Sequence, residues 1–81
     1  MISNETILIT GGAGYIGSIL TKKLVENNYN VKVIDSLVFG DDGISNLISD
    51  KKIEFFKIDI RDTEKIKVVL ENTDCVVHLA A

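Results

Sequence analysis

Short apolar runs recur along the chain, separated by segments whose apolar residues follow a helical period. The runs are Ile7–Ile9, Val31–Ile34, Ile53–Ile58 and Cys75–Leu79. Runs of this length, bounded by polar residues, are typical of strands that are covered on both faces. The pattern therefore predicts four buried strands with helices between them.

The segment Tyr15–Glu26 has the clearest helical periodicity. Its apolar residues fall at spacings of three and four, which predicts an inward-facing stripe made of Ile16, Ile19, Leu20 and Leu24. Asn27-Asn28 follows as a helix stop, because Asn tolerates the left-handed backbone conformation.

Two further helices are predicted in the second half of the chain. Ser45 is a candidate cap for a short helical piece that contains Leu47 and Ile48. Asp62 is a candidate N-cap for a helix over Thr63–Asn72. The residues of this longer helix that we expect to face inward are Ile66, Val69 and Leu70.

Strands that alternate with helices predict an α/β fold with a doubly wound parallel sheet of the Rossmann type, here partial, with strand order 3-2-1-4. With 81 residues the chain forms at most one small domain. In this order the first and fourth strands are neighbours where the winding reverses, and ligands bind in the crevice at such a point. The segments Gly11–Gly17 and Leu79–Ala81 then face each other across it.

Gly11, Gly14 and Gly17 fall three apart between the first strand and the first helix. The first glycine permits the tight turn, the second lets bare backbone approach a ligand, and the third allows close packing of helix on sheet. The new helix presents unpaired N–H groups and a positive dipole end, which suit a pyrophosphate. A P-loop is excluded because Ser18 and Ile19 stand where Lys and Ser/Thr are required. An ordinary glycine-rich turn is the alternative; the flanking strand and helix favour a dinucleotide.

Asp35 closes the second strand, where an acid can accept both hydroxyls of an adenosine ribose and repel a 2′-phosphate. The same residue could be an ordinary polar strand end. Combined with the glycine motif it predicts NAD rather than NADP as the cofactor.

Composition narrows the remaining function classes. The net charge of −3 gives no electrostatic footprint for nucleic acid or an anionic membrane, and no apolar run is long enough to span a bilayer. Cys75, the single cysteine, cannot form an internal disulfide, so we expect a cytoplasmic protein. Asp74 and Val76 flank it and neither is cationic, so we expect a buried rather than a reactive thiol. His78, the single histidine, lies in an apolar strand and is interpreted as structural. We therefore expect no metal site among these residues and no catalytic role for His78.

The motif Thr10–Ser18, which reads TGGAGYIGS, resembles the signature of the extended short-chain dehydrogenases/reductases. Within them it is most similar to the NAD-dependent epimerases and dehydratases of nucleotide sugars, such as UDP-glucose 4-epimerases. Asp35-Ser36-Leu37 resembles their Asp-Asn-Leu at the ribose, with Ser36 a mild departure. Asp59-Ile60-Arg61-Asp62 resembles a segment whose first two residues bind adenine, and His78-Leu79-Ala80-Ala81 resembles the end of the fourth strand beside the cofactor. The resemblance implies a cofactor site made of Gly11, Gly14, Tyr15, Ile16, Gly17, Asp35, Ser36, Leu37, Asp59, Ile60, Leu79, Ala80 and Ala81.

The same resemblance indicates which parts of the enzyme are not here. Catalysis in that family uses a Tyr-x-x-x-Lys pair, but Ile19 follows Tyr15 and Val33 follows Tyr29 at that spacing. We expect residues 1–81 to be the N-terminal portion of an NAD(P)-binding Rossmann domain, with the catalytic and substrate-binding parts beyond Ala81. The full-length protein would then take a sugar-nucleotide substrate and form a homodimer. The alternative is a non-catalytic NAD-binding redox sensor or regulatory protein of the same fold.

Overall fold

The computed structural model describes residues 5–11, 15–36 and 45–79. Along the chain the elements are β1 (Thr6–Thr10), α1 (Tyr15–Glu26), β2 (Asn30–Asp35), α2 (Ser45–Ser49), β3 (Ile53–Lys57), α3 (Thr63–Leu70) and β4 (Cys75–His78). Every predicted strand and helix is present, and α1 has the predicted bounds. None of the helices in the described ranges is long and apolar enough to cross a membrane.

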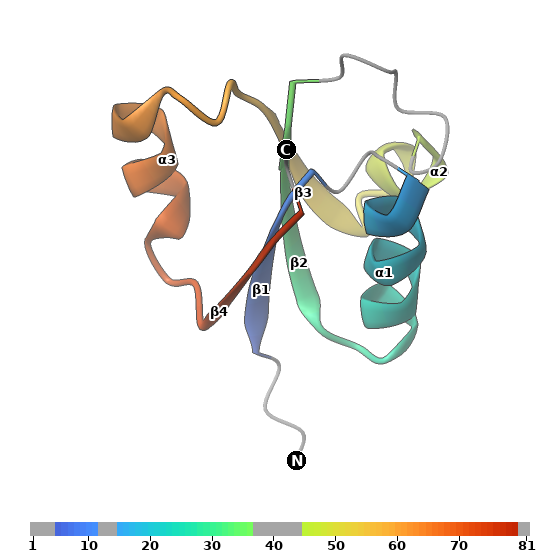
Figure 1. The fold of residues 1–81 in the computed structure, drawn as a ribbon. Coiled ribbons are helices and arrows are strands. Elements are labelled where there is room, and N and C mark those ends of the chain that lie inside the picture. Colours follow the sequence, from blue (N-terminus) through green and yellow to red (C-terminus); the bar gives the residue numbers. More distant parts are fainter. Residues whose placement is uncertain (1–4, 12–14, 37–44, 80–81) are drawn as a thin grey trace.

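Within the described residues the strands form one four-stranded parallel sheet in the order β3-β2-β1-β4, which confirms the predicted topology. α1 and α2 lie on one side of the sheet and α3 lies on the other (Figure 1). Because successive side chains of a strand point to opposite faces, each strand supplies residues to both layers. The carboxyl ends of all the strands meet at one edge.

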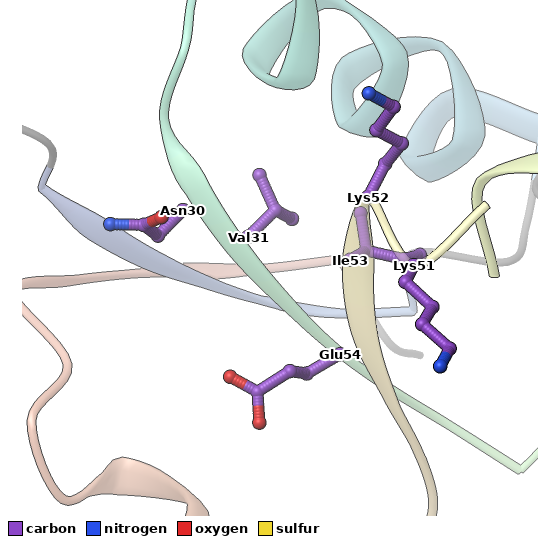
Figure 2. A pocket seen from close by; sticks show the side chains of 6 residues that line it. All are labelled: Asn30, Val31, Lys51, Lys52, Ile53 and Glu54. Carbon is purple, nitrogen blue, oxygen red and sulfur yellow. The ribbon is translucent and has the colours of Figure 1, made fainter.

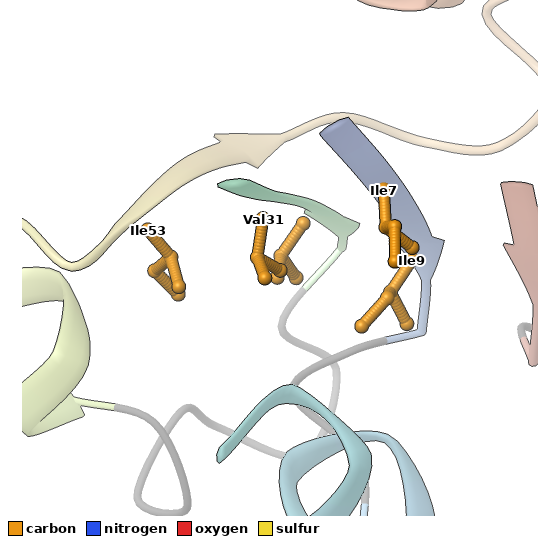
Figure 3. Close-up of a cluster of buried hydrophobic side chains, with 5 residues drawn as sticks. Ile7, Ile9, Val31 and Ile53 are labelled. Atoms are coloured by element: carbon orange, nitrogen blue, oxygen red, sulfur yellow. The ribbon is translucent and has the colours of Figure 1, made fainter. Parts of the chain in front are cut away.

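The core consists of two apolar clusters, one on each face of the sheet. On the α1 and α2 face, the sheet supplies the five buried residues Ile7, Ile9, Val31, Val33 and Ile53 (Figure 3). On the α3 face, Leu8 and Ile34 pack with Val69. Leu8 and Ile9, neighbours in β1, are both fully buried, so β1 is the strand most completely covered.

The inward face of α1 differs from the predicted stripe. Leu20 and Leu24 do pack against the core, but Ile16 is 63% exposed and Ile19 is 46% exposed. The buried positions of α1 are the small or polar residues Gly17, Ser18 and Thr21. A helix turns by about 100° per residue, so a face centred near Gly17 and Thr21 leaves Ile19 on the far side. Gly17 is buried on this face, where the absence of a Cβ allows close packing of a helix on a sheet. Asn28, just after the end of α1, has φ 67°, the left-handed conformation predicted for the helix stop.

The helix α3 begins as predicted and ends earlier. The side chain of Asp62 accepts a hydrogen bond from the backbone N–H of Lys65 (3.3 Å), which confirms the N-cap. The helix ends at Leu70, two residues before the predicted end, because Glu71 adopts an extended conformation. Val69 is buried and Ile66 is half-buried, whereas Leu70 is 40% exposed and the prediction for it was wrong.

The strand β4 is less covered than its apolar sequence predicts. Cys75 is exposed, so the expectation of a buried thiol was wrong, and Val76 is 48% exposed. Only Val77 packs against the cluster on the α1 face. The physical reason is the position of β4 at the end of the strand order, where it has a neighbour on one side only among the described residues.

Candidate cofactor-binding site

The turns that leave β1 and β3 are both bonded to the end of β2. The backbone N–H of Gly11 donates to the carbonyl oxygen of Ile34 (2.8 Å), and that of Ile58 donates to the carbonyl oxygen of Asp35 (3.2 Å). Each of these hydrogen bonds extends the parallel pairing with β2 by one residue past the end of the neighbouring strand. Gly11, Asp35 and the segment that follows Ile58 are therefore held together at the carboxyl edge of the sheet.

The glycine turn has the backbone geometry that its sequence predicts. Gly11 has φ 80°, a conformation that a side chain with a Cβ disfavours. Gly17 is buried, as its predicted packing role requires. Gly14 is also a predicted contact, but it lies outside the described residues.

The N-terminus of α1 suits an anion. Its first turn carries no acidic residue, whereas the first turn of α3 contains Glu64 next to the Asp62 cap. Tyr15 is 81% exposed and Ile16 is exposed as well, so both predicted contacts are open to a ligand. The positive end of the α1 dipole is thus not neutralised by a carboxylate of its own first turn. These features fit a pyrophosphate.

Asp35 lies half-buried at the last position of β2, and Ser36 beside it is exposed. Leu37, the third residue of this motif, lies outside the described residues. The structure adds one neighbour that the sequence analysis missed: Lys57, the last residue of β3, is the register partner of Asp35. Partners in a parallel pair project to the same face of the sheet, so a cationic residue stands next to the predicted ribose acceptor.

Asp59 and Arg61 form an exposed ion pair just past β3. Arg61 Nη2 lies 2.7 Å from Asp59 Oδ2, and Arg61 Nε and the Arg61 backbone N–H donate to Asp59 Oδ1 at 3.1 and 2.9 Å. The hydrogen bonds from the Arg61 side chain and backbone lower the pKa of Asp59 to about 2. The Arg61 contacts hold the Asp59 carboxylate in one orientation beside β3. Ile60, the other predicted adenine contact, is half-buried between them.

The end of β4 is tied to the end of β1. The backbone N–H of Leu79 donates to the carbonyl oxygen of Thr10 (2.9 Å), and His78 Nδ1 lies 2.6 Å from Thr10 Oγ1. The structure thus brings Leu79 beside the glycine turn, as the strand order predicts. The predicted contacts Ala80 and Ala81 lie outside the described residues.

Sequence reasoning missed Thr10 and Lys57 because their importance depends on strand register. In the sequence Thr10 is one residue of the glycine motif and Lys57 is one residue of a strand, and neither stands out there. Pairing the strands in the order 3-2-1-4 and counting back from their ends would have placed Thr10 opposite His78 and Lys57 opposite Asp35. The sequence contains this information, but it can be read only after the strands have been paired.

A hollow of about 400 Å³ lies at the opposite edge, where β2 and β3 begin. It is lined by Asn30, Val31, Lys51, Lys52, Ile53 and Glu54 (Figure 2). The side chains of Lys51 and Lys52 point in different directions, so they do not converge on one anion. Ligands of such sheets bind at the carboxyl ends, so this hollow is not the candidate site. Across the described ranges, no group of three or more His, Cys, Asp or Glu residues could hold a metal ion.

Comparison with known proteins shows which family the chain resembles and which solved structures share its fold. The family model described as GDP-mannose 4,6 dehydratase matches residues 8–81. The UDP-glucose 4-epimerase of Drosophila melanogaster is 36% identical over an alignment of 87 positions, which covers 94% of this chain and 25% of that protein. The chain thus spans about a quarter of the length of such relatives.

Two solved structures have the same fold over nearly the whole chain. The UDP-glucose 4-epimerase of Thermotoga maritima, solved with UDP-glucose, matches with a TM-score of 0.82 and 37% identity, over 94% of this chain and 24% of that one. The dTDP-glucose 4,6-dehydratase of Bacillus anthracis, solved in complex with NAD, matches with a TM-score of 0.86 and 25% identity, over 95% and 27%.

Proposed function

The chain belongs to the GDP-mannose 4,6 dehydratase family, and on this basis we propose that it forms the N-terminal, NAD-binding part of an NAD-dependent epimerase or dehydratase of nucleotide sugars. The observation that carries the proposal is the meeting of Gly11, Asp35 and Leu79 at the carboxyl edge of one parallel sheet. Those residues lie at or just after the carboxyl ends of three strands, so the pairing of β1 with both β2 and β4 brings them together.

Each part of the edge has a role in this proposal. The N-terminus of α1, with Gly11, Gly14, Tyr15, Ile16 and Gly17, holds the pyrophosphate. Asp35, with Ser36 and Leu37, accepts the hydroxyls of the adenosine ribose. Asp59 and Ile60 contact the adenine, and the residues that follow His78 flank the dinucleotide. When bound, NAD supplies a hydride acceptor that can take a hydride from the sugar and return it.

The substrate class is proposed from the relatives. The Drosophila and Thermotoga proteins are both UDP-glucose 4-epimerases, and the Thermotoga structure contains UDP-glucose. The full-length protein would act on a sugar nucleotide of this kind, as a cytoplasmic homodimer. The proton chemistry at the sugar requires an acid or base within hydrogen-bond reach of its oxygen, which we assign to a Tyr-x-x-x-Lys pair beyond Ala81.

Titration of NAD into the full-length protein tests the proposal, with Gly14→Val as the matched variant. A branched side chain at Gly14 occupies the space where backbone must approach the pyrophosphate, so NAD binding should fall sharply while the circular dichroism spectrum is unchanged. Normal NAD binding by Gly14→Val would contradict the assignment of the pyrophosphate seat.

A turnover assay with UDP-glucose separates the enzyme from its alternative. If the protein is an enzyme, it should interconvert or dehydrate the sugar nucleotide, and its sequence should contain a Tyr-x-x-x-Lys pair after Ala81. NAD binding without turnover, together with the absence of that pair, would instead indicate a redox sensor or regulatory protein of the same fold.

A further inference from the structure

Thr10 and His78 form a side-chain bridge across the first and fourth strands. They are register partners in the β1–β4 pair, and Thr10 Oγ1 lies 2.6 Å from His78 Nδ1. Thr10 is 3% exposed, whereas His78 is exposed. The same hydroxyl oxygen also receives the backbone N–H of Leu79 at 3.2 Å. One buried hydroxyl thus contacts both residues at the end of β4.

A hydroxyl has one hydrogen to donate and can also accept, and this limits where the protons of the bridge can lie. The Leu79 N–H is shared between the carbonyl oxygen of Thr10 (2.9 Å) and Thr10 Oγ1 (3.2 Å), so the hydroxyl oxygen accepts and its hydrogen still needs a partner of its own. Buried polar groups are nearly always paired, and His78 Nδ1 is the acceptor within reach. This pairing corresponds to the neutral tautomer of His78 in which Nδ1 is unprotonated and the ring proton is on Nε2.

We propose that Thr10 and His78 are positioning residues that set the separation of the glycine turn and the end of β4, and so the affinity for NAD. This inference rests on the proposed function. Thr10 directly precedes Gly11 and His78 directly precedes Leu79, both of which are predicted to flank the cofactor. Neither residue needs to touch NAD. The bridge keeps the glycine turn and the end of β4 at a fixed spacing before NAD binds. Less of the protein then has to become ordered on binding, so the free-energy cost of binding is smaller.

A double-mutant cycle in the full-length protein measures this coupling. Thr10→Val and His78→Leu each remove one partner, and each should raise the Kd for NAD about fivefold, the effect expected for one buried hydrogen bond. The double variant should be no more than about twofold weaker than either single variant, because the same bridge is lost in all three. Thr10→Ser retains the hydroxyl, and His78→Asn retains an acceptor. Each of these single variants should therefore bind NAD with the affinity of the wild type.

Thr73→Val is the matched control. Thr73 Oγ1 donates to the carbonyl oxygen of Val69 at 3.1 Å, so this variant also loses a threonine hydrogen bond. Thr73 lies before the start of β4, at the opposite edge of the sheet from the candidate site. We expect Thr73→Val to reduce stability and to leave the Kd for NAD unchanged.

The proton assignment has a separate spectroscopic readout. In the protein labelled with ¹⁵N-histidine, the His78 signals are identified by their loss in His78→Leu. The wild type should show a protonated Nε2 and an unprotonated Nδ1 at a pH where the ring is neutral, and Thr10→Val should shift the ring toward a mixture of tautomers. A protonated Nδ1 in the neutral wild type would overturn the assignment, whether or not the protein binds NAD.

The outcomes separate this inference from the proposed function. If the wild type binds NAD and the single variants bind it equally well, or if their effects simply add, the positioning role is wrong and the proposed function stands. If Thr73→Val weakens NAD binding as much as Thr10→Val does, the effect is one of general stability, and the positioning role is again wrong. If the wild type does not bind NAD, the proposed function is wrong and the role in affinity falls with it.

Discussion

Asp35 and Lys57 are register partners at the carboxyl ends of β2 and β3, so an acidic and a basic side chain stand next to each other where the adenosine ribose is proposed to bind. Asp35 should dominate the choice of cofactor, because a 2′-phosphate on the ribose would meet it as a like charge. We expect the wild-type full-length protein to prefer NAD over NADP by more than about tenfold. Asp35→Ala should reduce the ratio of the Kd for NADP to the Kd for NAD. Equal affinities of the wild type for the two cofactors would show that Asp35 does not select between them.

Lys57 should act in the opposite direction, since its positive charge offsets part of the repulsion that Asp35 exerts on a 2′-phosphate. In Lys57→Met the Kd for NADP should therefore rise by about twofold or more, with little change for NAD. The control is Lys52→Met, an exposed lysine that precedes β3 at the other edge of the sheet. An equal effect of both variants would indicate general electrostatics rather than the register pairing.

Lys32 on β2 caps the C-terminal end of α3. Its Nζ donates to the carbonyl oxygens of Val69 (3.1 Å) and Glu71 (2.8 Å), which are among the orphan acceptors of a helix end. Lys32→Met should lower the opening free energy of α3 by about 1–3 kcal/mol, measured by native-state hydrogen exchange of the α3 amides. Lys22→Met, an exposed lysine of α1, should change that exchange by less than about 0.5 kcal/mol. Unchanged protection of α3 in Lys32→Met would show that the cap has no energetic role.

The pair of Asp59 and Arg61 predicts a titration at unusually low pH. The pKa of Asp59 is about 2 in the folded protein, against an ordinary value of 3.8. Because the folded-state pKa is the lower one, the stabilisation from this carboxylate is present above about pH 4 and is lost as the pH falls toward 2. In Arg61→Gln the Asp59 pKa should return toward 3.8, as measured by carboxyl ¹³C NMR. The backbone N–H of residue 61 remains in this variant, so the same pKa in both proteins would mean that the Arg61 side chain is not its cause.

The sequence predicted the features that are encoded locally. Gly11 with its positive φ, the helix stop at Asn28 and the Asp62 cap each follow from the residue type and its neighbours. The alternation of strands and helices predicted the strand order, because few windings of such a chain are possible.

The errors arose where tertiary packing decides the outcome. Which residues of α1 face the sheet depends on the close approach at Gly17, and an apolar stripe at helical spacing did not reveal that Ile19 faces outward. Cys75 lies in an apolar run, yet it is exposed because β4 ends the strand order. Lys32 interrupts the apolar pattern of β2, and only the position of α3 shows what it binds.

A protein made of residues 1–81 alone should be inactive and prone to associate. It contains no Tyr-x-x-x-Lys pair, and it exposes apolar side chains both on α1, at Ile16 and Ile19, and on the edge strand β4, at Val76. An apolar strand at the edge of a sheet can pair with another chain, and a domain of this size is only marginally stable. Sedimentation should show oligomers or aggregates, and an assay with UDP-glucose should show no turnover. A monomer that unfolds cooperatively would contradict the first expectation, and steady turnover would contradict the second.

A crystal structure of the full-length protein with bound NAD tests the central claim most directly. The account predicts the pyrophosphate at the N-terminus of α1, with a ribose hydroxyl within hydrogen-bond distance of Asp35 and the adenine beside Asp59 and Ile60. Density for the dinucleotide at another place, such as the hollow between Asn30 and Lys52 at the amino ends of β2 and β3, would contradict it.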